Sequence, residues 1–194
     1  MATIGLKDLY YAPITEDSAG NETYGTPAVL AKAISANIEV NTDTATLYAD
    51  DGADVVIREF TSGTITLNTA SLSAASQAAL LGATVDTKGV LMQRAEDTPV
   101  PVAIGFKAKT AKGNYKYFWL YRVVFGAPGA DLNTKGETIE FATPEIEGTF
   151  VRRNKVDTQS KRPFMATIDG DETGADASTM SGWFSAVYEP TYGP

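Results

Sequence analysis

Residues 115–126, with the sequence YKYFWLYRVVFG, form the longest nearly continuous apolar run of the chain. The run is too aromatic and too β-branched for a surface helix, so it predicts a β-strand. Because successive side chains of a strand point to opposite faces, the odd-numbered residues from Tyr115 to Phe125 would form one wholly apolar or aromatic face. The other face is apolar in its middle and carries Lys116 and Arg122 towards its ends. We therefore expect this strand to be covered on both sides, either in a two-layer core or by a neighbouring chain.

The composition narrows the classes of function. The 194 residues suit a single domain spanning residues 1–194, and a chain of this length needs no disulfides to be stable. It has neither Cys nor His, which removes thiolate chemistry, the usual general base and the usual zinc ligand. A formal charge of −8 argues against ordinary nucleic-acid binding, which needs a basic surface. We expect no enzymatic activity and no cofactor.

The sequence gives no sign of membrane insertion. The N-terminal stretch MATIGLKDLYYAP has neither the basic nor the apolar region of a signal peptide. No apolar run approaches the roughly 20 residues of a membrane-spanning helix. We expect no membrane anchor, and the lack of Cys fits synthesis in the cytoplasm.

Short alternating segments joined by turns fill most of the chain. The segments at 102–109 and 115–125 should pair as a hairpin, because their joining loop is short and contains Gly113 and Asn114. About nine or ten strands against one firm helix predict a mainly β fold of the α+β kind, with two packed β-sheets in a sandwich or barrel and one flanking helix. The expected strands lie at 33–40, 46–49, 55–60, 64–67, 102–109, 115–125, 136–150 and 163–168, with a tight hairpin at 85–93.

The stretch from Ser71 to Leu81 has the spacing of a helix. Apolar residues recur at intervals of three to four between Leu72 and Leu80 and give a narrow stripe that suits packing against a sheet. Thr69 or Ser71 can cap its start, and Gly82 ends it. A second, short helix is expected within residues 178–188.

Two polar segments are predicted to be loops. Residues 14–27 form a long N-terminal loop that contains Gly20, Asn21 and Gly25, and residues 43–54 surround the turn Asp50-Asp51-Gly52. We expect both to be mobile in the free chain and to become ordered against a partner. A C-terminal extension, at about 154–194, shows no familiar pattern.

Four clusters of charged residues are candidate sites, and the simpler explanation for each is a solvated surface. The segment Asp169–Gly174 starts like a calcium loop, but Met180 stands at the twelfth position, where such a loop needs Glu. The neighbouring carboxylates Asp50-Asp51 and Glu145-Ile146-Glu147 do not by themselves give the facing pair of a glycosidase. The basic cluster from Arg152 to Arg162 suits an acidic surface, on this chain or a neighbour, better than nucleic acid. No catalytic or metal site is predicted.

Several stretches together resemble a known family. They are IGLKDLYYAPI at 4–14, ISANIEVNTDTATLYADD at 34–51 with EFTSGTITLN at 59–68, SLSAASQAALLGA at 71–83 and YFWLYR at 117–122. These stretches and their order resemble the major tail proteins of long, flexible-tailed phages, which build the tail tube. The likeness covers most of the chain and includes no catalytic signature.

The resemblance implies a fold of two packed β-sheets flanked by a helix. It also implies self-assembly into hexameric rings whose strands close into a barrel around a channel. Such rings stack into a tube through which DNA passes during ejection. The implied partners are further copies of the chain, other tail proteins such as the tape measure and the tail terminator, and DNA only in transit. The implied location is the virion, in the phage tail, after synthesis in the host bacterial cytoplasm.

Three groups of residues are candidates for these roles. Acidic strand residues would line the lumen, unless they lie on the outer surface and serve only solubility: Glu39, Glu59 and Glu140. Residues of the acidic hairpin would contact the next ring: Asp43, Tyr48, Asp50, Asp51 and Asp54. Aromatic residues of the central strand would pack between subunits: Tyr117, Trp119 and Tyr121.

A carbohydrate-binding or adhesive β-sandwich module is the alternative from another class. Its stacking platform would be Trp119 or Trp183, exposed on a monomer. The acidic character of the chain favours the tube, because like charge keeps DNA phosphates from adhering to a channel wall.

Overall fold

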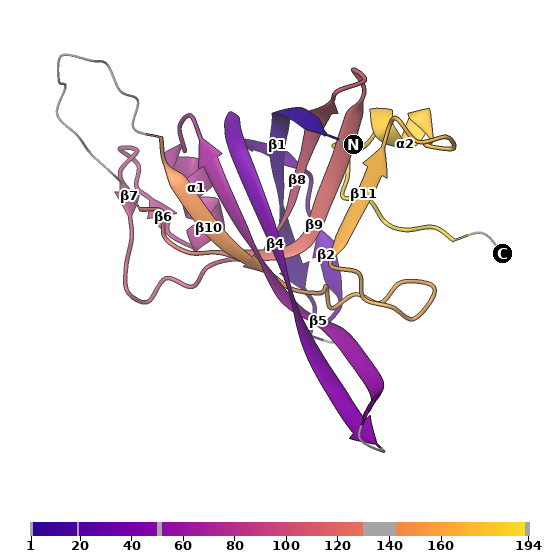
Figure 1. The fold of residues 1–194 in the computed structure, drawn as a ribbon. Coiled ribbons are helices and arrows are strands. Elements are labelled where there is room, and N and C mark those ends of the chain that lie inside the picture. Colours follow the sequence, from indigo (N-terminus) through magenta and orange to yellow (C-terminus); the bar gives the residue numbers. More distant parts are fainter. Residues whose placement is uncertain (1, 19, 50–51, 130–142, 193–194) are drawn as a thin grey trace, which may run out of the picture.

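The structure, a computed structural model, describes residues 2–18, 20–49, 52–129 and 143–192, with the backbone alone at 47–49 and 52–54. Nine of its strands join one antiparallel sheet in the order β2-β1-β8-β9-β10-β5-β4, with β3 beside β1 and β11 beside β9 (Figure 1). The strands of this sheet are β1 (Thr3–Glu16), β2 (Glu22–Tyr24), β3 (Ala28–Ala31), β4 (Ala33–Ala49), β5 (Gly52–Thr69), β8 (Val102–Thr110), β9 (Tyr115–Phe125), β10 (Glu145–Phe150) and β11 (Met165–Asp169).

A small hairpin and two helices complete the described part of the chain. Strands β6 (Thr84–Val85) and β7 (Leu91–Met92) form the tight hairpin expected from the sequence. Helix α1 (Ala74–Leu81) lies beside the sheet, and the short α2 (Ala177–Ser181) follows β11. The predicted mainly β fold with a flanking helix is confirmed.

The large sheet curls, so that β1 and β4 approach each other without pairing. Its inner side packs the larger of two cores, with fully buried residues from strands and helix such as Leu9, Ile65, Leu80 and Ile104. A second core lies on the outer side of β8 and β9. Its buried members are Ala12, Ala103, Trp119, Tyr121, Trp183 and Val187.

Strand β9 is covered on both faces by its own chain. Trp119 belongs to the second core, whereas Leu120 belongs to the larger one. The pairs Val102↔Val123 and Ile104↔Leu120 leave one extra residue on β9, which is a β-bulge. The bulge turns the side chains of the following residues to the opposite faces of the sheet, so Val123 packs in the larger core together with Leu120. The single alternation predicted to run through Phe125 is therefore wrong beyond Tyr121.

Helix α1 begins at Ala74 because Ser73, and not Thr69 or Ser71, caps it. The Ser73 hydroxyl accepts the backbone N–H of Ser76 at 3.0 Å. The Ser76 hydroxyl in turn donates to the carbonyl of Leu30 at 3.0 Å, which ties the helix to β3. As expected, Gly82 ends the helix, in a left-handed conformation with φ of 69°.

The hairpin β4–β5 is much longer than the sequence predicted. Its ladder runs from Ala33↔Thr69 to Ala49↔Gly52, so the four short strands expected between residues 33 and 67 are two strands of 17 and 18 residues. The error arises in residues 41–46, which are polar and show no apolar alternation. Backbone hydrogen bonds continue the ladder through them regardless of side-chain polarity.

Residues 14–27 do not form the predicted long loop. Ile14 pairs with Tyr24 and Glu16 pairs with Glu22, so β1 and β2 make a hairpin. The Asp17 carboxylate accepts the backbone N–H and the side-chain amide of Asn21, both at 2.8 Å, and closes the turn. The polar residues therefore shape a short turn and a paired strand.

The last third of the chain supplies two strands and a non-helical segment. The strand expected at 163–168 is confirmed as β11, which pairs with β9. Of the strand expected at 136–150, β10 is found at its end, and residues 136–142 lie outside the described residues. Residues 182–192, here called the C-terminal segment, leave α2 and cover the second core, and the helix expected at 178–188 ends at Ser181.

Candidate functional site

A polar face covers the outer side of three neighbouring strands, β10, β5 and β4. Their inward residues are apolar, such as Ile146 and Leu67, which are 1% and 0% exposed. Their outward residues are carboxylates, amides and hydroxyls, which the antiparallel pairing aligns in rows across the strands. The rows are Glu145–Asn68–Ser35, Glu147–Thr66–Asn37 and Thr149–Thr64–Glu39.

This polar face carries three carboxylates and no cation in those rows. Glu39, Glu145 and Glu147 make no ion pair with the described residues. Two hydrogen bonds of 3.1 Å order the amides, from Asn37 to Glu39 and from Asn68 to the Ser35 hydroxyl. Such a surface holds water and repels phosphate groups.

Two of the three residues predicted to line a lumen lie at different positions of the β4–β5 hairpin. Glu39 lies on the polar face and is exposed. Glu59 is exposed farther along β5, where it pairs with Asp43. Glu140 lies outside the described residues. Glu145 and Glu147 were not among the residues predicted to line a lumen. The alternation of EIEGTF at 145–150 could have indicated their outward position, because its second and sixth residues are apolar and buried.

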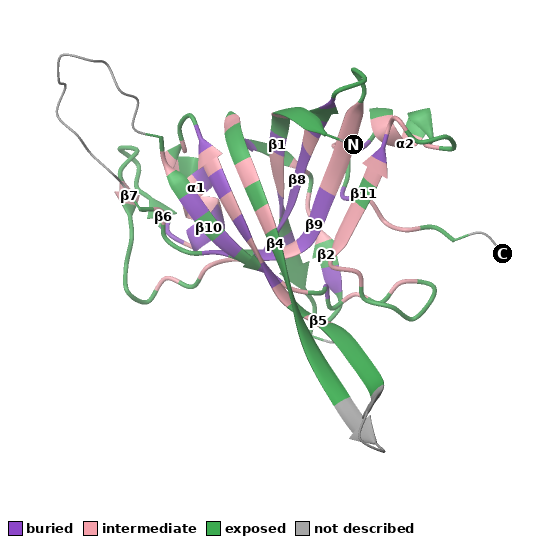
Figure 2. Ribbon diagram, viewed as in Figure 1, coloured by how far each residue is buried: buried purple, intermediate pink, exposed green. Residues whose placement is uncertain are grey.

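Beyond the polar face the hairpin continues as a projecting arm, defined here as residues 41–60. It extends away from the curled body (Figure 1), and its described side chains up to Glu59 are exposed on both faces (Figure 2). Three consecutive apolar side chains, Val55, Val56 and Ile57, are 42%, 59% and 54% exposed. An isolated two-stranded hairpin is marginally stable in water, so this arm is a surface that a partner can stabilise.

One face of the arm combines apolar and acidic groups. Ile57 pairs with Ala45, and the next pair on the same face is Asp43↔Glu59. Like charges directly opposite each other across two strands destabilise the pair. The arm as a whole has five carboxylates and one arginine. A cationic partner would therefore relieve repulsion on the arm.

The described residues that were predicted to contact the next ring all belong to the arm. Asp43 is exposed on β4. Tyr48 lies on β4 and Asp54 lies on β5, while Asp50 and Asp51 lie outside the described residues. The arm is a paired hairpin, so the prediction that residues 43–54 are a loop is wrong.

Two of the three aromatic residues predicted to pack between subunits are buried inside this chain. Trp119 and Tyr121 are 0% and 1% exposed, and Trp119 Nε1 donates to the carbonyl of Trp183 at 3.0 Å. They are not available to a neighbour, because the C-terminal segment covers them. Tyr117 is half-buried, and its role stays a prediction. Trp183 is only 3% exposed, so the sugar-stacking platform of the alternative reading is also absent from these two tryptophans.

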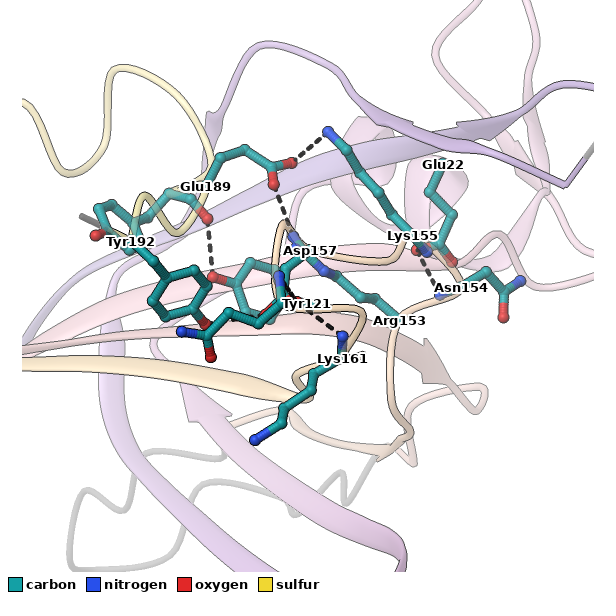
Figure 3. A network of polar contacts seen from close by, with 11 residues as sticks. Glu22, Tyr121, Arg153, Asn154, Lys155, Asp157, Lys161, Glu189 and Tyr192 are labelled. Atoms are coloured by element: carbon teal, nitrogen blue, oxygen red, sulfur yellow. Dashed lines mark hydrogen bonds and ion pairs between the residues drawn. The ribbon is translucent and has the colours of Figure 1, made fainter. Parts of the chain in front are cut away.

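A polar network fixes the C-terminal segment to the sheet (Figure 3). Arg153 is fully buried, and its Nη1 donates to Glu189 at 2.8 Å, while Lys155 Nζ donates to the same carboxylate at 2.9 Å. Burial lowers the pKa of Arg153, but the hydrogen bond and the charge of Glu189 outweigh it and raise that pKa above its usual value. Two members of the basic cluster therefore pair with an acidic group of their own chain.

Glu22 forms a second buried anchor. Its side chain is 0% exposed, contacts Arg122, and accepts the backbone N–H of Asn154 at 2.8 Å. Arg122 also contacts the more exposed Glu16, and their hydrogen bond lowers the pKa of Glu16. Glu16 and Glu22 of the β1–β2 hairpin therefore stabilise the fold, because their carboxylates bind Arg122 and Asn154.

Other polar clusters resemble structural turns. Asp169 is the last residue of β11, and Asp171 lies in the turn that follows, where its carboxylate accepts the Asn114 amide at 2.8 Å. Within the described ranges no group of three or more His, Cys, Asp or Glu residues is arranged to hold a metal ion. Neither helix of the described chain is long and apolar enough to cross a membrane.

No family model matches the sequence, and no curated protein matches it. One similar solved structure is the cryo-EM structure of the cap that terminates the tube of the anti-feeding prophage. The two share 10% identity and a TM-score of 0.46, over 88% of this chain and 93% of that one.

Proposed function

We propose that this chain is a structural protein of a phage tail that self-assembles into stacked hexameric rings around a channel for DNA, with the ring number taken from the resemblance to the tail-tube family.

 One observation carries the proposal. The β4–β5 hairpin contributes to a polar face that has no cation in its rows, and the same hairpin continues as the projecting arm. The first suits a channel wall, and the second suits contact with another copy. The resemblance of the sequence to the major tail proteins of long-tailed phages supports the same function.

The polar face has the chemistry that a DNA channel requires. DNA carries a dense row of negative charge, so a wall bearing Glu39, Glu145 and Glu147 repels phosphates and does not bind them. The remaining residues of the rows are hydroxyls and amides, which keep the wall hydrated without adding positive charge. Rings of carboxylates from several copies would repel one another, but water and salt screen exposed charges beyond about 8 to 10 Å.

The open edges of the sheet supply the means of ring formation. Among the described strands, β4 pairs only with β5 along its whole length. Its other edge is therefore free to pair with another chain. A free strand edge exposes unpaired backbone N–H and C=O groups, which another chain can satisfy. Closure of a ring in this way leaves no free edge, which favours closed assemblies over monomers.

The test compares assembly of the wild-type chain with that of two matched variants. Ile57→Asp changes the exposed arm, and Val90→Asp changes an exposed apolar residue of the β6–β7 hairpin, which is 50% exposed. We expect stacked rings in negative-stain images of the wild type and of Val90→Asp, and single rings that do not stack from Ile57→Asp. A wild-type chain that remains monomeric at high concentration would refute the proposed function.

A further inference from the structure

A strip of basic and aromatic side chains lies on the outer side of β1, β8 and β9, close to the turn between β8 and β9. Its lysines are Lys7 on β1 and Lys107 and Lys109 on β8, and the ladder places Lys7 directly opposite Lys107. The next strand, β9, places Tyr117 and Tyr115 opposite the two lysines of β8. These five side chains share one face of the sheet, because the residues that alternate with them point to the larger core.

Two of the three lysines in this strip keep their charge unpaired. Asp8 binds Lys107 at 2.5 Å, and the Lys107 ammonium lies over the Tyr115 ring at 4.9 Å from its centre. Lys7 and Lys109 are exposed, and neither forms an ion pair with any described residue. Like charges directly opposite each other on two strands repel, so added negative charge would stabilise the strip.

One face of the arm carries complementary groups. Val55, Ile57 and Glu59 alternate along β5 and therefore share a face, on which Asp43 of β4 is directly opposite Glu59. The two apolar residues are 42% and 54% exposed, and the two carboxylates form no ion pair with the described residues. Arg58 points to the other face of the arm. The face is therefore acidic and apolar, whereas the strip is basic and aromatic.

The arm and the strip lie at opposite ends of the body (Figure 1). The arm extends from one end, and the turn between β8 and β9, which adjoins the strip, lies at the other. The nine residues 41–49 of β4, at about 3.3 Å each, make the arm roughly 30 Å long. The arm therefore reaches towards the strip of a neighbouring copy and away from the strip of its own chain.

We propose that the acidic face of the arm docks on the basic and aromatic strip of the next copy in a stack. The two carboxylates of the arm face the unpaired Lys7 and Lys109, and its exposed apolar residues pack on the two tyrosine rings. The inference rests on the proposed function and names the two surfaces that join successive rings. Because these surfaces differ and lie at opposite ends, the contact is heterologous and gives the tube a direction.

Crosslinking tests the contact directly, because the chain has no cysteine of its own. Gly5 is opposite Lys109 on the strip, and a β-carbon at Gly5 would meet no atom within 4 Å. Gly5→Cys/Ile57→Cys therefore places one thiol on the strip and one on the arm, and the control Val90→Cys/Ile57→Cys moves the first thiol to the β6–β7 hairpin. After oxidation of assembled protein we expect a ladder of covalent oligomers from the first variant and none from the control.

The possible results separate the docking site from the proposed function. Stacked rings of Gly5→Cys/Ile57→Cys that give no ladder, or an equal ladder from the control, would overturn the docking site and leave the proposed function standing. A wild-type chain that forms no rings would overturn both.

A charge reversal gives an independent readout. Lys7→Glu/Lys109→Glu should raise the protein concentration needed for stacking by at least about tenfold, because it places like charges against each other across the contact. Adding Asp43→Lys/Glu59→Lys to the same chain should restore stacking, since the two surfaces again have opposite charge.

The matched control is Lys88→Glu/Lys161→Glu, which makes the same change of charge at exposed positions away from the strip and should stack as the wild type does. Equal effects of the two reversals, or no recovery after the second pair of substitutions on the arm, would show that the strip does not bind the arm.

Discussion

At the residue scale, the fold depends on a few charged side chains that are removed from water. Glu22 joins the β1–β2 hairpin to β9 and to the segment after β10, through Arg122 and the backbone of Asn154. Arg153 does the same for the C-terminal segment through Glu189. Removing one partner from such a pair leaves an uncompensated charge in the interior, which costs more than the pair itself contributes.

Replacing Glu22 by Ala should lower the free energy of unfolding by about 3–5 kcal/mol, because Arg122 and two backbone N–H groups lose a buried carboxylate. The matched control is Glu147→Ala, at an exposed position without an ion pair to the described residues, with an expected change within about 0.5 kcal/mol. Urea unfolding monitored by tryptophan fluorescence measures both. Equal stability of the two variants would show that the Glu22 contacts are energetically unimportant.

The sequence could not reveal these pairs. Glu22 and Arg122 are 100 residues apart, and nothing in their local sequence marks one as the partner of the other. The sequence did predict that the basic cluster near Arg153 would meet an acidic surface, but the choice of Glu189 depends on the path of the C-terminal segment. The sequence shows which residues are charged, but only the fold determines which of them lie close enough to form ion pairs.

At the element scale, local periodicity predicted the strands well wherever apolar residues alternate. The hairpin of β8 and β9 and the strand β11 were predicted, because their pattern and turns are local. The bulge in β9 and the continuous β4–β5 ladder were not, since both depend on how one strand registers with another. The alignment of Glu145 and Glu147 with Asn68 and Thr66 was not predicted for the same reason, because it depends on the pairing of β10 with β5.

The short helix α2 gives a pH-dependent prediction. Hydrogen bonds from Ser178 and Thr179 to the Asp176 carboxylate lower the pKa of Asp176 well below its usual value. A carboxyl whose pKa is lower in the folded chain stabilises it above the unfolded-state pKa, and that contribution is lost as the pH falls through the folded-state pKa. Acidification should therefore loosen α2, and Asp176→Asn should weaken it already at neutral pH.

Hydrogen exchange of residues 177–181 measures this effect. We expect protection in the wild type to fall as the pH is lowered, after correction for the intrinsic exchange rate, and to depend less on pH in Asp176→Asn. Asp43→Asn, on the distant arm, is the control and should keep the wild-type dependence. If Asp176→Asn and the wild type show the same pH dependence, the cap is not responsible.

At the scale of the whole molecule, different kinds of side chain are found in different regions of the fold. Apolar residues of the sheet fill two cores, the polar face presents carboxylates and hydroxyls, and the arm presents apolar and acidic groups together. The aromatic strand that suggested contact with a neighbour is instead covered by the C-terminal segment. A two-sided apolar strand thus predicts burial but does not reveal which chain buries it.

The last prediction concerns the wall of the proposed channel. If the polar face lines it, Glu145→Lys/Glu147→Lys turns a repelling surface into one that binds phosphate, and short labelled DNA should be retained by assembled tubes at low salt. The retention should fall as salt rises, because binding to lysine releases the counterions of DNA. Glu96→Lys/Glu172→Lys carries the same change of charge at exposed positions away from the polar face and is the matched control. Sedimentation of tubes with labelled DNA compares the two variants, and equal retention by both would place the polar face outside the channel.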